Sequence, residues 1–162
     1  MKNWRTVIGG GEFKVMRLQD APAGVEILDN PHRIVEYLER MLTTSVVFRP
    51  DVENLMVVLL NTRKNVIGFE IIGNGTLDTC LMHPREIFKA AIVTNAASIV
   101  LAHNHPSGDP TPSEADIKYT RDVIRCGQLM KIEVLDHVIL GRQTIERTKG
   151  WSSLWELGYL YN

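Results

Sequence analysis

Two short apolar stretches constrain the fold of this chain more than any other feature. Residues 55–60 and 96–102 are each as long as a strand, and neither alternates regularly between apolar and polar side chains. A strand with one face in water alternates, whereas a strand covered on both faces stays apolar throughout. We therefore expect an α/β or α+β fold in which helices sandwich a mixed sheet.

The segments around these stretches predict the other strands. Residues 54–61 and 65–72 are separated by a turn-like segment, residues 62–64, and predict an antiparallel pair inside the covered sheet. Residues 131–140 and 143–147 predict two further strands on the same grounds. The strands should therefore be joined by short turns at some points and by helices at others.

Four helices are expected around the sheet. The first covers residues 30–44, because Asn30 is a good N-cap and apolar side chains repeat with helical spacing after it. A second helix should open at Pro84, since proline is favoured at the first helical position. A third is expected over residues 112–126, and a short closing helix over residues 151–157.

The composition fits one globular domain. The chain has 162 residues, of which 44% are hydrophobic, and a chain of this length buries roughly 70% of its unfolded surface without disulfides or structural metals. A metal would therefore serve chemistry rather than hold the fold. We expect residues 30–162 to form the domain, and residues 1–29, which have no sustained period, to form an irregular or hairpin-forming extension.

Charge and apolar content disfavour several classes of partner. The formal net charge is −1, so no whole-molecule field attracts nucleic acid or an anionic membrane. The longest apolar run, residues 55–60, is far shorter than the roughly 20 residues of a membrane-spanning helix. Cys80 and Cys126 fit no zinc-ribbon spacing, so both are expected to be reduced. A cytoplasmic location is the simplest expectation.

The stretch after the second apolar run carries the chemistry. In an extended segment, residues two apart face the same way, so His103 and His105 can present both imidazoles to one point beyond the strand. A proline-rich loop leads to a capping box of Thr111 and Glu114, and Asp116 lies near the start of the following helix. If the loop folds this helix back over the strand end, two histidines and a carboxylate leave a fourth position for water, as in catalytic zinc sites.

Each residue of this set also has a simpler explanation. A lone His-x-His pair is common, and Ser113, Glu114 and Asp116 are typical of helix starts whether or not they bind a metal. Capping requires neither two histidines after an apolar strand nor a proline-rich loop, so the complete set favours a metal site with zinc as the metal. Glu70 interrupts an apolar strand, where a carboxylate must be paired or reactive; an outward-facing edge position is the alternative.

Asp136 and His137 are adjacent in the predicted strand over residues 131–140. Neighbouring residues in a strand face opposite sides, so one of the two faces inward. That residue either orients a ligand imidazole by a hydrogen bond or belongs to a polar pair satisfied within the core.

The spacing of the candidate ligands resembles that of the JAB/MPN metalloprotease superfamily, also called JAMM. The motif of that superfamily is a distant glutamate, then His-x-His, seven residues, Ser, two residues and Asp. His103, His105, Ser113 and Asp116 match this spacing without a gap. Segments 84–88, 101–108, 112–116 and 135–137 more narrowly resemble the bacterial RadC-like branch, and the similarity covers roughly residues 30–148.

The resemblance implies the JAB/MPN architecture, which is similar to that of cytidine deaminases, and a role for each matching residue. His103, His105 and Asp116 would bind Zn²⁺, Glu70 would be the general acid and base, and Ser113 would stabilise the oxyanion. The implied activity is that of a zinc-dependent metalloprotease or isopeptidase that cleaves an amide bond in a peptide or protein substrate. A bacterial cytoplasmic protein, with a homodimer as a further form, is the corresponding expectation.

Two other functions are left open by the sequence. Some superfamily members are non-catalytic interaction modules, although these have lost ligands that are intact here. A nucleic-acid role is the other alternative, since the RadC-like branch carries a DNA-repair label. RadC proteins typically carry a helix-hairpin-helix region before this domain, and residues 1–29 do not resemble it, so with the near-neutral charge we expect no DNA binding.

Overall fold

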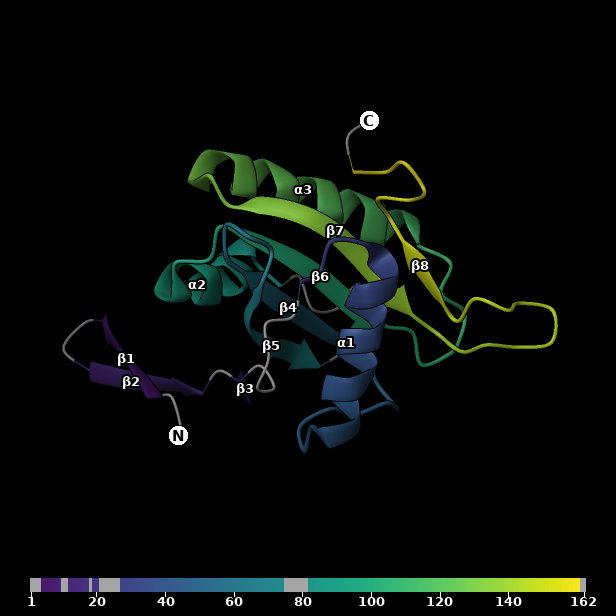
Figure 1. Cartoon of the computed structure of the whole chain (residues 1–162), viewed down its shortest axis with the longest axis horizontal. Helices are drawn as coiled ribbons and strands as arrows, with labels where there is room; N and C mark the ends of the chain where they lie inside the picture. Colours follow the sequence, from purple (N-terminus) through teal and green to yellow (C-terminus); the bar gives the residue numbers. More distant parts are fainter. Residues whose placement is uncertain (1–3, 10–11, 18, 21–26, 75–81, 161–162) are drawn as a thin grey trace.

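We describe residues 4–9, 12–17, 19–20, 27–74 and 82–160 of a computed structural model of the chain. One mixed sheet has the strand order β3-β5-β4-β6-β7-β8 (Figure 1). These strands are β3 (Gln19–Asp20), β4 (Asn54–Leu60), β5 (Val66–Asn74), β6 (Ser98–Asn104), β7 (Glu133–Leu140) and β8 (Trp151–Ser153). β6 and β7 are parallel, and the other neighbouring pairs are antiparallel. Parallel neighbours require a crossover connection, which contains the helix α3 (Glu114–Met130).

Helices cover both faces of this sheet (Figure 1). α1 (Pro31–Thr44) packs on one face, and α2 (Pro84–Thr94) and α3 pack on the other. Every residue of β4 and β6 is buried, and successive side chains alternate between two hydrophobic clusters. Val57 lies in the cluster with α2 and α3, whereas Met56 and Val58 lie in the cluster with α1. The sandwiched mixed sheet expected from the continuous apolar runs is therefore confirmed.

The N-terminal part contains a hairpin, one of the two forms expected for it. β1 (Trp4–Gly9) and β2 (Glu12–Arg17) pair antiparallel as a sheet of their own. No helix in the described ranges has the length and apolar character needed to cross a bilayer. Cys126 is a free thiol, and Cys80 lies outside the described residues.

The start of α3 differs from the sequence prediction. Its N-cap is Ser113 rather than Thr111, and Asp116 rather than Glu114 completes the capping box. Both pairs have the same three-residue spacing, so the sequence pattern did not distinguish them. The structure selects the pair whose carboxylate turns toward the end of β6.

The end of α3 also differs, because the helix continues through Gly127 to Met130. A Cβ at position 127 would lie 2.5 Å from the carbonyl oxygen of Ile132. The glycine therefore permits close approach of the returning chain and does not stop the helix. Lys131, with a left-handed φ of 57°, is the residue at which the helix ends.

The C-terminal segment corrects two further predictions. Residues 143–147 form no strand, and the closing helix expected over residues 151–157 is instead strand β8 followed by turns. β8 pairs with the edge of β7, from Val138 opposite Ser153 to Leu140 opposite Trp151. Pairing with a distant strand satisfies the backbone groups of β7, and local periodicity does not reveal such a contact.

Candidate metal centre

The two predicted histidine ligands lie at the carboxyl end of β6. Between them, Asn104 fixes the strand end to the start of β4: its Oδ1 accepts from the backbone N–H of Asn54 at 2.9 Å, and its Nδ2 donates to the carbonyl of Val52 at 2.9 Å. Because successive residues of an extended chain alternate, His103 and His105 both face away from this amide. The fixed strand end thus presents two imidazoles to one point.

His103, His105 and Asp116 form the one group among the described residues whose side chains could together hold a metal ion. The two histidine Nε2 atoms are 2.9 Å apart. Oδ1 of Asp116 lies 3.4 Å from Nε2 of His103, and Oδ2 lies 3.6 Å from Nε2 of His105. The side chains of His103 and Asp116 are 1% and 2% exposed, against 16% for His105, so the cluster meets solvent beside His105.

Asp116 reaches this point because α3 begins next to the end of β6. The hydroxyl of Ser113, the N-cap, accepts from the backbone N–H of Asp116 at 3.1 Å and donates to its Oδ2 at 2.7 Å. The backbone N–H of Ser113 donates to the same oxygen at 2.8 Å. One carboxylate therefore completes the capping box and faces the histidines, with its orientation fixed by two donors.

A buried chain of hydrogen bonds sets the tautomer of His103. The backbone carbonyl of Asp116 can only accept, and the hydroxyl of Thr120 donates to it at 2.6 Å. Oγ1 of Thr120 must then accept from Nδ1–H of His137, at 2.5 Å, which leaves Nε2 of His137 to accept from Nδ1–H of His103 at 2.8 Å. Nε2 of His103 consequently carries a lone pair directed at the cluster.

His105 is oriented in the same way by a backbone group. Its Nδ1–H donates to the carbonyl of Asp109 at 2.6 Å, so Nε2 of the neutral imidazole also carries a lone pair. Two lone pairs 2.9 Å apart, next to the carboxylate of Asp116, repel one another unless a cation lies among them. That cation is either a proton or a metal ion, and two imidazole nitrogens with a carboxylate oxygen are donors that Zn²⁺ prefers.

The charge states of His103 and Asp116 also suit a metal. Burial, reinforced by the charge of His137, lowers the pKa of His103 well below its usual value, and burial lowers the pKa of His137 to about 4. Burial would raise the pKa of Asp116, but the interactions with His105, His103 and Ser113 outweigh it and hold that pKa well below its usual value. Near neutral pH the imidazole of His103 is therefore neutral and the carboxylate of Asp116 is ionised, which are the metal-binding forms. The hydrogen bond with Asp116 raises the pKa of His105, so a metal ion at this site would displace a proton from His105.

The C-terminal arm, residues 141–150, fixes the loop that carries Asp109. Nη2 of Arg147 donates to the carbonyl of Gly108 at 2.6 Å, and Nη1 lies 3.3 Å from Oδ1 of Asp109. Gly141 permits the close approach, since a Cβ there would lie 2.6 Å from the same carbonyl oxygen of Gly108. The orientation of His105 thus depends on contacts between two segments far apart in the sequence.

Comparison with known proteins identifies the family. The RadC-like JAB domain family matches residues 28–157 of the chain. The chain belongs to the RadC-like JAB domain family. The match includes β4 to β8, helices α1, α2 and α3, and every member of the metal cluster.

Several bacterial relatives support this membership of the RadC-like family. UPF0758 protein STH371 of Symbiobacterium thermophilum is 42% identical over 146 residues, which cover 90% of this chain and 57% of the relative. A UPF0758 protein of Chlorobium chlorochromatii is 40% identical over 168 residues, covering 99% of this chain and 72% of the relative. UPF0758 protein TTE0897 of Caldanaerobacter subterraneus is 52% identical over 89 residues, which cover 55% of this chain and 38% of the relative. The chain thus spans less than two thirds of the STH371 and TTE0897 proteins.

Within this RadC-like domain, Glu70 lies on the same face of the sheet as the metal cluster but outside it. The register through β4 places Glu70 on the face that carries Leu101 and therefore also His103. β5 is two strands from β6, about 10 Å at the usual strand spacing. Glu70 is half-buried; burial raises its pKa, the charge of Lys89 lowers it and that of Glu86 raises it. Its role as acid and base remains a prediction.

Asp136 and His137 face opposite sides of β7. His137 contacts His103, as described, while Oδ2 of Asp136 accepts from the hydroxyl of Ser153 at 2.6 Å and Oδ1 accepts from the backbone N–H of Trp155 at 3.1 Å. The carboxylate of Asp136 thus attaches the C-terminal segment to the sheet, on the side of β7 opposite the imidazole of His137.

Sequence reasoning missed three groups that orient the ligands in the RadC-like domain. They are the hydroxyl of Thr120, the carbonyl of Asp109 and the guanidinium of Arg147. Thr120 follows Asp116 by four residues on α3, and this helical spacing could have indicated it. A backbone carbonyl leaves no sequence signal, and Arg147 lies in a segment for which the sequence predicts a strand.

Proposed function

We propose that this RadC-like domain is a zinc-dependent hydrolase that cleaves an amide bond in a peptide or isopeptide. The observation that carries the proposal is the hydrogen-bonded chain from the Asp116 carbonyl through Thr120 and His137, which leaves Nε2 of His103 unprotonated within a two-histidine, one-carboxylate cluster. A closed structural site would have a fourth protein ligand, whereas three ligands with solvent access beside His105 suit catalysis.

The three ligands and Glu70 have separate proposed roles. His103, His105 and Asp116 would hold the ion, which when bound supplies Lewis-acid polarisation and a lowered pKa for water. Glu70 is the proposed base that takes a proton from the attacking water and passes it to the departing nitrogen. A pKa raised by burial suits both tasks, since the group must take up and release a proton near neutral pH.

Ser113 is the proposed donor to the developing oxyanion, and its hydroxyl donates to Asp116 in the structure. To act on the substrate, this hydroxyl would rotate from Asp116 toward the carbonyl oxygen. The backbone N–H of Ser113 would continue to hold the carboxylate during that rotation.

The test separates metal binding from proton transfer. Purified wild type should contain zinc and cleave members of a peptide and isopeptide panel, whereas His103→Ala and Asp116→Ala should lose both zinc and cleavage. Glu70→Gln should retain zinc but lose about 100-fold or more in kcat. Glu36→Gln, at an exposed carboxylate on α1 on the other face of the sheet, serves as a control that retains both.

Two results would contradict the proposal. Equal zinc content in wild type and His103→Ala would remove the metal assignment. A zinc-loaded wild type that cleaves no member of the panel would favour the non-catalytic interaction module instead.

A further inference from the structure

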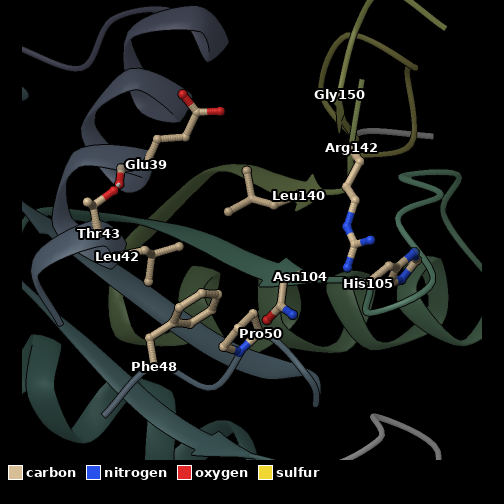
Figure 2. A pocket seen from close by; sticks show the side chains of 11 residues that line it. Glu39, Leu42, Thr43, Phe48, Pro50, Asn104, His105, Leu140, Arg142 and Gly150 are labelled. Carbon is tan, nitrogen blue, oxygen red and sulfur yellow. Dashed lines mark hydrogen bonds between the residues drawn. The ribbon is translucent and has the colours of Figure 1, made fainter. Parts of the chain in front are cut away.

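A groove opens beside the metal cluster on the side of the sheet covered by α1. It has a volume of about 610 Å³ and runs between the C-terminal half of α1, the segment that follows α1, and the end of β7 (Figure 2). A cavity of this size suits a small ligand or a few residues of a peptide. Its walls include Leu42, Phe48, Pro50 and Leu140, so its middle is apolar.

His105 belongs to both the groove and the metal cluster. It lines one end of the groove, next to Asn104 and Arg142, while its imidazole faces away from Asn104 and its Nε2 lies 2.9 Å from that of His103. His105 is also the most exposed of the three candidate ligands. A molecule lying in the groove would therefore have one end next to the most exposed candidate ligand.

The two ends of the groove carry opposite charges (Figure 2). Arg142 lies at the end next to His105, and Glu39 lies at the other end, with the apolar side chains between them. Both charged residues are exposed. Within the described ranges, neither the guanidinium of Arg142 nor the carboxylate of Glu39 has an ion-pair partner. Both charges are available to a ligand.

We propose that this groove binds an extended peptide segment of the substrate, and this inference rests on the proposed amide hydrolysis. The segment carries a carboxylate that pairs with Arg142 close to the scissile bond, one or two bulky apolar side chains over Leu42, Phe48 and Leu140, and a cationic side chain toward Glu39. A carboxylate pairs well with the planar guanidinium. The apolar middle contributes affinity by burial, while the opposite charges at the two ends select the direction of the peptide.

The experiment measures binding without cleavage. Fluorescein-labelled peptides with a Leu-Leu pair between an Asp and a Lys, in both orders, are titrated with the metal-free full chain and followed by fluorescence anisotropy. Matched peptides have Asn and Gln in place of Asp and Lys. One charged order should bind more tightly than the other order and than both neutral peptides.

Variants then locate the binding site. Arg142→Glu should weaken binding of the preferred charged peptide by about tenfold and favour a peptide with Lys in place of Asp. Phe48→Ala, at a partly exposed wall position, should weaken binding of charged and neutral peptides alike. Arg121→Glu changes an exposed arginine on α3, on the opposite side of the sheet, and should leave binding unchanged.

The outcomes distinguish this inference from the proposed function. Absence of binding by every peptide, equal binding of charged and neutral peptides, or an unchanged affinity in Arg142→Glu overturns the groove assignment. Binding that depends on Arg142 in a protein that cleaves nothing supports the groove and contradicts the hydrolase. Cleavage with the same KM in wild type and Arg142→Glu supports the hydrolase and contradicts the groove assignment.

Discussion

Thr120 shows how one hydroxyl can determine the state of a ligand that it does not touch. Its only proton goes to a backbone carbonyl, and that direction is passed through His137 to His103. Residues that hydrogen-bond to ligand imidazoles commonly contribute a factor of about 10 to 100 in metal affinity. The buried threonine is therefore expected to affect zinc binding from outside the ligand set.

Thr120→Val should weaken zinc binding by about tenfold, because His137 would lose its acceptor and either tautomer of His103 could form. Thr120→Ser, which keeps the hydroxyl, should bind zinc as wild type does. Competition with a chromophoric chelator measures both affinities, and ¹⁵N chemical shifts of the imidazoles report the tautomers. Equal affinity in the valine variant and wild type would show that the hydrogen-bonded chain does not act on the metal.

The buried histidines also predict how the stability of the metal-free protein depends on pH. The pKa of His137 is about 4 in the folded protein and near 6.5 when unfolded, so the unfolded state takes up the proton first as pH falls. The contribution of His137 to stability is therefore unaffected above pH 6.5 and decreases by about 3 kcal/mol between about pH 6.5 and 4. Urea unfolding across this range, in chelator, should show a shallower pH dependence for His137→Gln. A parallel pH dependence in the variant would contradict this assignment.

At this scale the sequence predicted the ligands but not their orientation. The spacing of His103, His105 and Asp116 is a local pattern, and the structure brings all three together. The carbonyl of Asp109 that orients His105 carries no side-chain signature, and a threonine inside a helix is common enough to pass unnoticed.

Among the elements, α3 connects secondary structure directly to the site. Its capping box uses the same carboxylate that faces the histidines. Removing the N-cap hydroxyl should therefore affect both the helix and the metal, whereas removing the cap of another helix should affect stability alone. α1 offers the comparison, because Asn30 caps it by accepting from the backbone N–H of Arg33 at 3.0 Å.

Ser113→Ala and Asn30→Ala should each lower the free energy of unfolding by about 1 kcal/mol. Only Ser113→Ala should also weaken zinc binding, since Asp116 loses one of the two donors that fix its carboxylate. Urea unfolding of the metal-free variants and chelator competition give the two quantities. If both variants bind zinc as wild type does, capping and metal binding are independent.

Element types were predictable where burial is complete and poorly predictable where pairing is distant. The continuous apolar runs of β4 and β6 predict strands covered on both faces, and both strands are fully buried in the structure. The sequence wrongly predicts a helix at β8, because the strand conformation of β8 comes from pairing with β7. The predicted start of α3 lies two residues too early, because two overlapping capping boxes fit the same stretch.

On the scale of the whole molecule, contacts between remote segments complete the site. The arm over residues 141–150 holds the loop of Asp109 through Arg147 and through the close approach at Gly141. The layers of the fold follow from its apolar pattern, but these loop contacts depend on backbone positions that no pattern in the sequence specifies. A small change at Gly141 should therefore alter the orientation of His105 and the affinity of the cluster for zinc.

Gly141→Ala should destabilise the protein by about 1–3 kcal/mol and weaken zinc binding, because the new Cβ meets the Gly108 carbonyl and the ring of Pro110 at 2.6 and 2.8 Å. Gly73→Ala is the control, since its Cβ meets the flexible end of Met82 at 2.8 Å and should be accommodated at smaller cost. Thermal unfolding and chelator competition compare the two. Wild-type zinc affinity in Gly141→Ala would show that the arm does not position His105.

The double exposure of His105, to the metal cluster and to the groove, has a thermodynamic consequence. A peptide in the groove and an ion in the cluster would both contact the same residue, so the affinity for each would depend on whether the other is bound. By linkage, the factor by which peptide changes zinc affinity equals the factor by which zinc changes peptide affinity. Cofactor retention and substrate recognition would then be reciprocal properties of one residue.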